Sequence, residues 1–172
     1  IGMLTGQAEQ QARWKRCVAA TDGALGDLTG QVFTRERFSA AAKQAAEGQV
    51  HAISAAMQAN LDALPWMDDA TKQAARAKLE AMTYQIGYPK TWRPAALTIG
   101  AGYAANALAA RKAERARLLA KIGKPLDRDD WQMSAPTVNA YYDPALNGMV
   151  FPAGTLQPPF FSMAADDAVN YG

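Results

Sequence analysis

The sequence predicts an α+β fold that is mainly helical and carries a small β segment near its C-terminal end. Through about the first two-thirds of the chain, apolar residues recur at helical spacing. After residue 125 the pattern changes to short alternating segments separated by Asp-Pro and Asn-Gly pairs, which favour strands and turns. Of the 172 residues, 49% are apolar and 20% are charged, which is typical of a folded globular chain. We therefore expect a helical region over residues 1–125 and a β part over residues 126–172.

The first half of the helical region is expected to hold three helices. One covers residues 7–20 and is followed by a break at Asp22-Gly23, after which a short helix covers residues 24–33. The third shows the clearest periodicity and ends or bends at Pro65. Its apolar stripe consists of Val50, Ile53, Met57, Leu61 and Leu64.

Asp68 is the expected N-cap of the next helix, whose apolar stripe runs to Ile86 before a helix stop at residues 87–89. Residues 103–122 are expected to be helical again, with a basic face. That face carries Arg111, Lys112, Arg115, Arg117 and Lys121. Because no aromatic residues lie between these charges, we interpret the face as a solvated helix surface. A net charge of +2 likewise gives no reason to expect a nucleic-acid partner.

The β part is expected to form a strand over residues 137–142, a turn, and a return strand over residues 149–151. An edge strand leaves backbone N–H and C=O groups unpaired, and a peptide can add itself to that edge. Asn139 suits such a site because its amide both donates and accepts hydrogen bonds. The alternative is that Asn139 merely starts a turn and that Val138, Tyr141 and Phe151 belong to the core.

No residue pattern in this chain points to a complete catalytic centre. His51 is the one histidine and Cys17 the one cysteine, whereas a zinc site needs several converging ligands. We expect His51 to pair with Glu47 on a helix surface and Cys17 to be a small buried hydrophobe. Adjacent acids, expected to be solvated, occur at Asp68-Asp69, Asp129-Asp130 and Asp166-Asp167. No glycine-rich phosphate-binding motif is present, and no apolar run has membrane-spanning length.

Several runs of the sequence resemble the neprilysin-like zinc metalloendopeptidases. Asn139-Ala140-Tyr141-Tyr142 is similar to the family's Asn-Ala-aromatic-Tyr motif, and Phe151-Pro152-Ala153-Gly154 follows in register. Residues 156–161, of sequence Leu-Gln-Pro-Pro-Phe-Phe, continue the match. Further similar runs are found at residues 13–17, 66–68, 86–89, 131 and 170–172. The resemblance spans nearly the whole chain and is least distinctive over about residues 90–125.

The resemblance implies an intact protein that uses zinc to cut oligopeptides, usually before a hydrophobic residue. This chain would lead from a helical region into the edge-strand hairpin of a thermolysin-like catalytic domain, which it contains in part. Asn139 would bind the substrate main chain through its side-chain amide, and Ala140 through its carbonyl, within the motif that Tyr142 completes. Phe160 would form a wall of the pocket for the residue after the cut. Thr155 occupies a pocket position that is often a larger aliphatic residue in relatives.

By the same resemblance, the zinc-binding helix and the remaining catalytic groups would lie beyond Gly172. We therefore expect a central fragment that alone neither holds catalytic zinc nor cleaves peptides. Its partners would be peptide substrates and the remainder of the parent polypeptide, without which Phe160, Phe161 and Met163 would lack cover. Its exposed strand edge could also support self-association. Cys17 matches a cysteine that is disulfide-bonded in secreted animal relatives, although its partner is not in this chain.

The family analogy implies a periplasmic or secreted location. A second hypothesis, from a different class, is a non-enzymatic helical binding or scaffold protein whose apolar C-terminal segment docks a partner. The two hypotheses differ in whether a zinc-binding His-Glu-x-x-His motif belongs to the same polypeptide.

Overall fold

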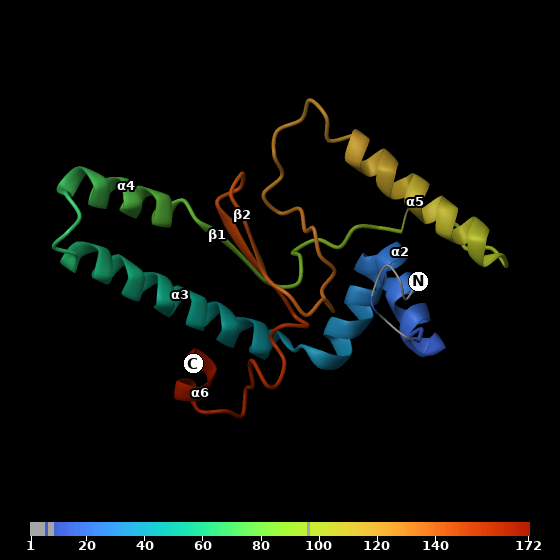
Figure 1. The fold of residues 1–172 in the computed structure, drawn as a ribbon, viewed down its shortest axis with the longest axis horizontal. Coiled ribbons are helices and arrows are strands. Elements are labelled where there is room, and N and C mark those ends of the chain that lie inside the picture. The colour runs from blue at the N-terminus through green and yellow to red at the C-terminus, as the bar shows by residue number, and fades with distance from the viewer. Residues whose placement is uncertain (1–5, 7–8, 96) are drawn as a thin grey trace.

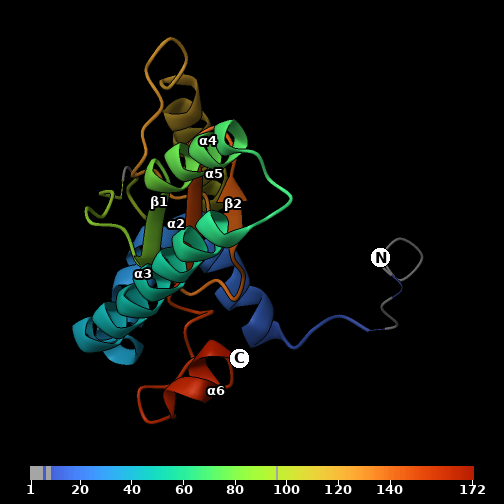
Figure 2. The same cartoon turned by 90° about the vertical axis from the view of Figure 1, so that its left-hand side faces the viewer.

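The computed structural model of the chain describes residues 6, 9–95 and 97–172, and it confirms a mainly helical α+β fold. In chain order the elements are α2 (Arg13–Arg37), α3 (Ala40–Ala63), α4 (Asp69–Glu80), β1 (Thr83–Gly87), α5 (Tyr103–Leu119), β2 (Tyr141–Asp143), β3 (Gly148–Pro152) and α6 (Asp167–Tyr171). Helices α3 and α4 extend to one side of the small sheet, whereas α2 and α5 lie on its other side (Figure 1). In both views α6 lies below α3, near the C-terminal end (Figures 1 and 2).

The three strands form one sheet in the order β1-β3-β2. Strand β1 runs parallel to β3, with Ile86 opposite Phe151, and β2 runs antiparallel to β3, with Tyr141 opposite Val150. The prediction that a helix continues to Ile86 is wrong, because α4 ends at Glu80 and β1 begins at Thr83. Strand β1 is rich in β-branched and aromatic residues, and its pairing with β3 outweighs the helical spacing of its apolar positions.

The core lies where the end of α2, the start of α3 and the sheet meet. Its buried residues are Phe38, Ala42, Ala46, Ile86, Ala135, Ala153 and Phe161. The ring of Phe38 lies so close to Gly87 that a Cβ there would come within 2.4 Å of Cε1. Gly87 also has a φ of +78°, which L side chains rarely adopt, so both the backbone and the packing require glycine at the end of β1.

Helix α2 consists of two helical segments joined across a kink at Leu25, whose φ and ψ of −135° and 36° are not helical. The kink lies two residues after the predicted break at Asp22-Gly23, and residues 7 and 8 of the first predicted helix lie outside the described residues. Residues 11–19 are exposed, so the prediction that Cys17 is buried is wrong. Nothing in the described part of the chain covers this end of α2, where Trp14 and Val18 are also exposed.

Helices α3 and α4 follow the predicted boundaries more closely. Helix α3 ends at Ala63, before Pro65, and the Asp68 side chain caps α4 by accepting a hydrogen bond from the Thr71 N–H at 2.7 Å. The predicted stripe of α3 is only partly buried: Leu61 is buried and Val50 packs against the core, but Ile53 and Met57 are exposed. The small side chains Ala42 and Ala46 make the inward contact instead, because α3 approaches the sheet closely there.

Gly154 lies where two backbone segments come into direct contact. A Cβ at Gly154 would lie 2.3 Å from the Pro136 carbonyl oxygen and 2.7 Å from that of Thr137. The Gly154 N–H donates to the Ala135 carbonyl at 2.8 Å, so Gly154 is also hydrogen-bonded to the segment that it approaches. The segment after β3 and the segment before β2 can therefore lie together only if residue 154 has no side chain.

We predict that Gly154→Ala destabilises the protein by about 1–3 kcal/mol, because the new methyl group must push apart two hydrogen-bonded backbone segments. Gly48→Ala is the matched control, since Gly48 lies inside α3 with no atom within 4 Å of its added Cβ. That control is expected to stabilise the protein by about 0.5–1 kcal/mol through helix propensity. Thermal or denaturant unfolding checks both, and equal effects of the two substitutions would contradict the close approach.

Candidate substrate-binding edge

The residues of the Asn-Ala-aromatic-Tyr motif lie at the edge of the sheet. Strand β3 is central, and β2 is one of the two outer strands. The pairing of β2 with β3 begins at Tyr141, so Asn139 and Ala140 come directly before the strand. The prediction that the strand starts at residue 137 is therefore wrong, since residues 137–140 are held by turns and side-chain contacts instead of the ladder.

The side chain of Asn139 is exposed, and its oxygen is already oriented by the backbone. Oδ1 accepts a hydrogen bond from the Ala140 N–H at 2.8 Å, which directs the amide along the chain. Within the described residues the Asn139 amide nitrogen has no hydrogen-bond partner, so it can donate to a ligand carbonyl. Val138 is 67% exposed, so it does not belong to the core, contrary to the alternative weighed for this segment.

Thr155 lies beside Asn139, as its Oγ1 donates to the Asn139 carbonyl at 2.5 Å. Thr155 closes a turn, because its own N–H donates to the Pro152 carbonyl at 3.0 Å. Within that turn, the Ala153 N–H donates to the Gly87 carbonyl at 2.8 Å. The turn is thus fixed to the end of β1 and also contacts the motif.

Phe160 is 66% exposed, whereas Phe161 is 5% exposed and belongs to the core. The expectation that both rings lack cover is therefore wrong for Phe161. Phe161 faces inward and anchors the segment, which leaves Phe160 on the surface. The next stretch is held by Asn170, whose side chain exchanges two hydrogen bonds of 3.0 Å with the backbone of Ser162.

The two tyrosines of the motif make different contacts. The Tyr142 hydroxyl donates to Oδ1 of Asn147, in the turn between β2 and β3, at 3.0 Å. The Tyr141 hydroxyl accepts a hydrogen bond from the Gln132 N–H at 3.1 Å. Burial raises the pKa of Tyr141, and the nearby carboxylate of Asp143 raises it further, so this phenol stays neutral at physiological pH. The structure thus brings Asn139, Ala140 and Thr155 together, whereas Tyr142 supports the hairpin turn.

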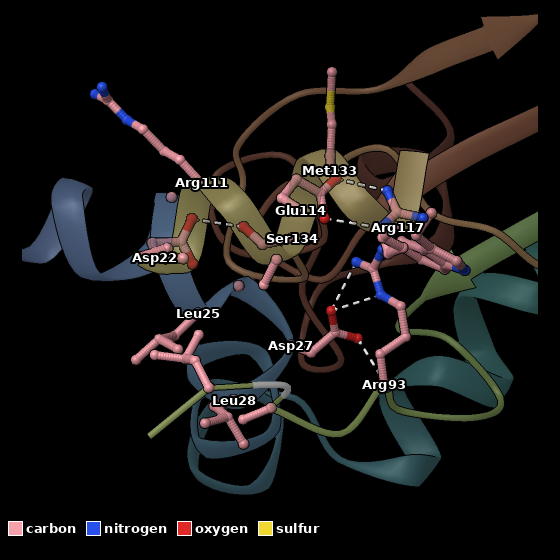
Figure 3. A pocket seen from close by; sticks show the side chains of 18 of the residues that line it. Asp22, Leu25, Asp27, Leu28, Arg93, Arg111, Glu114, Arg117, Met133 and Ser134 are labelled. Atoms are coloured by element: carbon pink, nitrogen blue, oxygen red, sulfur yellow. Dashed lines mark hydrogen bonds and ion pairs between the residues drawn. The ribbon is translucent and has the colours of Figure 1, made fainter. Parts of the chain in front are cut away.

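A hydrogen-bonded network connects α2 to the segment before the motif. Asp22 accepts from the Ser134 hydroxyl at 2.6 Å (Figure 3). It also accepts from the Thr29 hydroxyl at 2.5 Å. The Ser134 oxygen also lies 3.0 Å from Oγ1 of Thr137. Asp22, which was interpreted as part of a helix break, therefore binds residues 134–137 from α2, just before the non-helical residue Leu25.

A cluster of paired charges lies beyond this network. Arg93 binds Asp27 with three donors: its backbone N at 3.1 Å, its Nε at 2.8 Å and its Nη2 at 2.7 Å. Arg117 binds Asp130 at 3.0 Å and Glu114 at 2.7 Å. The hydrogen bond from Arg117 lowers the pKa of Glu114.

Two predictions about these charges need correction. Asp130 was expected to be solvated, but its side chain is 18% exposed and also pairs with Lys121. Arg117 therefore does not belong to a purely solvated face of α5, and Lys121 lies in the turn after that helix. Arg111, Lys112 and Arg115 are exposed as expected. Sequence reasoning missed the cluster because its partners come from α2, α5 and two loops, with no local motif to mark them.

A cavity of about 1090 Å³ lies between α2, α5 and the loops around Arg93 and Ser134 (Figure 3). One of its walls contains Asp27, Arg93, Glu114 and Arg117. Neither Asn139 nor Thr155 lines this cavity. Its carboxylates at Asp27 and Glu114 are already neutralised by the arginines beside them. The cavity is thus a polar junction that is separate from Asn139 and Thr155.

Within the described residues, no group of three or more His, Cys, Asp or Glu side chains is arranged to hold a metal ion. His51 is exposed, and its ring packs edge-on against Tyr84 with 6.3 Å between centroids. The expected ion pair between His51 and Glu47 is not formed. The residues present here therefore do not fit a zinc site. No described helix is long and apolar enough to cross a membrane.

Comparison with known families identifies two stretches of this chain. Residues 1–89, just over half of the chain, match the N-terminal model of peptidase family M13, and residues 139–172 match a second model of the same family. The chain belongs to peptidase family M13. The resemblance to neprilysin-like metallopeptidases is thereby confirmed, and the scaffold hypothesis is not favoured.

Individual M13 relatives match nearly the whole chain. The endothelin-converting enzyme homolog of Locusta migratoria is 35% identical over 98% of this chain, and neprilysin of Mus musculus is 31% identical over 98%. The crystal structure of Mycobacterium tuberculosis zinc metalloprotease Zmp1 in complex with an inhibitor matches 99% of the chain with a TM-score of 0.88 and 39% identity. The matched region is 24% of each of the first two proteins and 26% of the third, so the chain spans about a quarter of these relatives.

We predict that Asp27→Asn destabilises the M13 protein by about 1–3 kcal/mol, because the neutral amide weakens three charge-assisted hydrogen bonds to a half-buried partner. Asp129→Asn is the control, since Asp129 is 66% exposed and lies 3.8 Å from Lys90. Such an exposed pair contributes less than about 1 kcal/mol. Denaturant unfolding of both variants checks this, and a loss at Asp129 as large as that at Asp27 would contradict it.

Proposed function

We propose that this chain is part of a zinc-dependent metalloendopeptidase that hydrolyses oligopeptides, and that it supplies the strand edge that binds the substrate backbone. The observation that carries the proposal is the place of Asn139. It lies at the outer edge of the sheet, directly before β2, with its amide oxygen bound internally and its amide nitrogen directed to no described partner. Membership of a peptidase family supports the reaction class.

In this proposal a substrate extends along the β2 edge as an added strand. The Asn139 side-chain nitrogen donates to a substrate carbonyl, and the Ala140 carbonyl accepts from a substrate N–H. These contacts involve only the main chain of the substrate, so peptides of many sequences can make them. Selectivity for a hydrophobic side chain after the cut then comes from a pocket to which Thr155 and the exposed ring of Phe160 contribute.

The intact protein would hold its zinc through residues outside this chain, since those described here do not form a site. A bound zinc ion in such an enzyme activates water and polarises the scissile carbonyl. The part assigned to this chain is to bind and orient the peptide. The proposal also includes the remainder of the parent polypeptide as the partner that covers Phe160 and Met163, which are 66% and 57% exposed.

Two further parts of the proposal concern association and location. The unpaired outer edge of β2 can join a second copy of the chain when no substrate or covering segment occupies it. The intact protein is assigned a periplasmic or secreted location by analogy with its family.

We expect Asn139→Ala, made in the intact protein, to lower kcat/KM for peptides by about 10- to 100-fold, because one hydrogen bond to the substrate main chain is lost. The control is Asn60→Ala, an exposed asparagine on α3. The assay uses peptides with a hydrophobic residue after the cut, and a chelator should abolish the activity. Activity that survives chelation would exclude the zinc mechanism. An unchanged kcat/KM in Asn139→Ala would exclude the substrate-binding role of Asn139.

We also expect residues 1–172, expressed alone, to bind less than stoichiometric zinc and to cleave no peptide, because the described residues contain no ligand cluster. Metal analysis after dialysis, together with a peptide cleavage assay, checks this. A one-to-one zinc content with chelator-sensitive cleavage would show that a metal site exists within this chain.

A further inference from the structure

We infer that Thr155 is a positioning residue for Asn139, and that the site depends on its hydroxyl group more than on the space its side chain fills. This inference rests on the proposed substrate-binding role of Asn139. The contact that motivates it is the hydrogen bond of 2.5 Å from Thr155 Oγ1 to the Asn139 carbonyl. It joins two residues that were each expected to touch the substrate separately.

Asn139 has few other means of being held in place. It lies outside the β2–β3 ladder, which begins at Tyr141, so strand pairing does not fix its main chain. Within the described part of the chain, its side chain bonds only to the next residue, by accepting from the Ala140 N–H. Among the described residues, Thr155 is the one from outside this segment that hydrogen-bonds Asn139. Removing the hydroxyl would therefore leave Asn139 with the local bond to the Ala140 N–H and with no described hydrogen bond to another segment.

Thr155 is in turn well placed to act as a fixed donor. Its backbone N–H closes a turn by donating to the Pro152 carbonyl at 3.0 Å. The two preceding residues bind the Gly87 and Ala135 carbonyls at 2.8 Å each, and Ala153 is fully buried. A donor carried by a turn with three backbone anchors holds its acceptor in one place, which is what a preorganised binding group requires.

Thr155 is also proposed to contribute to the pocket for the residue after the cut, so the effects of its hydroxyl group and of its methyl group must be measured separately. Two substitutions separate these roles. Thr155→Val keeps the size and the β-branch of the side chain but removes the donor, whereas Thr155→Ser keeps the donor and removes the methyl group. A positioning role predicts that Thr155→Val weakens substrate binding and that Thr155→Ser does not. A pocket role predicts that serine alters the substrate preference more than valine does.

The first experiment measures kcat and KM of the intact protein on peptides carrying Ala, Leu or Phe after the cut. We expect Thr155→Val to raise KM about tenfold for all three peptides with little change in kcat, because a substrate main-chain contact is lost in ground state and transition state alike. Thr155→Ser should stay within about twofold of the wild type. In an Asn139→Ala background, Thr155→Val should have little further effect, because both changes remove the same contact.

The second experiment does not depend on catalysis. Hydrogen exchange of the peptide that covers residues 138–143 should be faster in Thr155→Val than in the wild type, and unchanged in Thr155→Ser. Unchanged exchange in Thr155→Val would overturn the inference, as would equal losses of activity in the two variants. If the wild type cleaves no peptide, the proposed function fails, whereas the exchange result still decides whether the hydroxyl holds Asn139.

Discussion

The close contact between the turn after β3 and the segment before β2 is the constraint on which the rest of the structure depends. Ala135 and Ala153 lie on its two sides with 1% and 0% of their surfaces exposed, and Gly154 has no room for a side chain. Small residues allow the two backbones to bond directly instead of through side chains. Because the same turn binds Gly87 at the end of β1, one contact connects both outer strands of the sheet.

Polar side chains of helix α2 stabilise this contact. Asp22, near the kink of α2, binds Ser134, and Asp27, one turn further along the helix, binds Arg93. The segment that leads to Asn139 is therefore tied to α2 by partly buried polar bonds, which weaken little with salt compared with exposed pairs. Strand β1 also comes from the part of the chain that was expected to be helical. The division into regions at residue 125 stays a prediction, since the sheet draws on both sides of it.

Much of the fold was predictable from local signals, whereas its long-range contacts were not. The Asp68 cap, the end of α3 and the turn before β3 follow from residue types that favour those conformations. Strand β1 was missed because its conformation depends on pairing with β3, far along the chain, and its apolar residues also fit a helical spacing. The exposure of Cys17 could not be predicted either, because burial depends on which other segments cover α2. The motif residues were found by resemblance, but the bond between Thr155 and Asn139 needed coordinates.

The position of Asn139 just outside the ladder has a physical consequence for the substrate-binding role that we propose for it. A residue inside β2 would be fixed by the pairing with β3, in which every second residue of the strand directs both its N–H and its C=O toward the partner strand. Asn139 avoids this restriction, but it then needs side-chain bonds to hold it, and those bonds come from Thr155 and from its own amide oxygen. With the oxygen already bound to the Ala140 N–H, the amide has one orientation before any ligand arrives. A peptide that binds there does not have to order the side chain, so less conformational entropy is lost on binding.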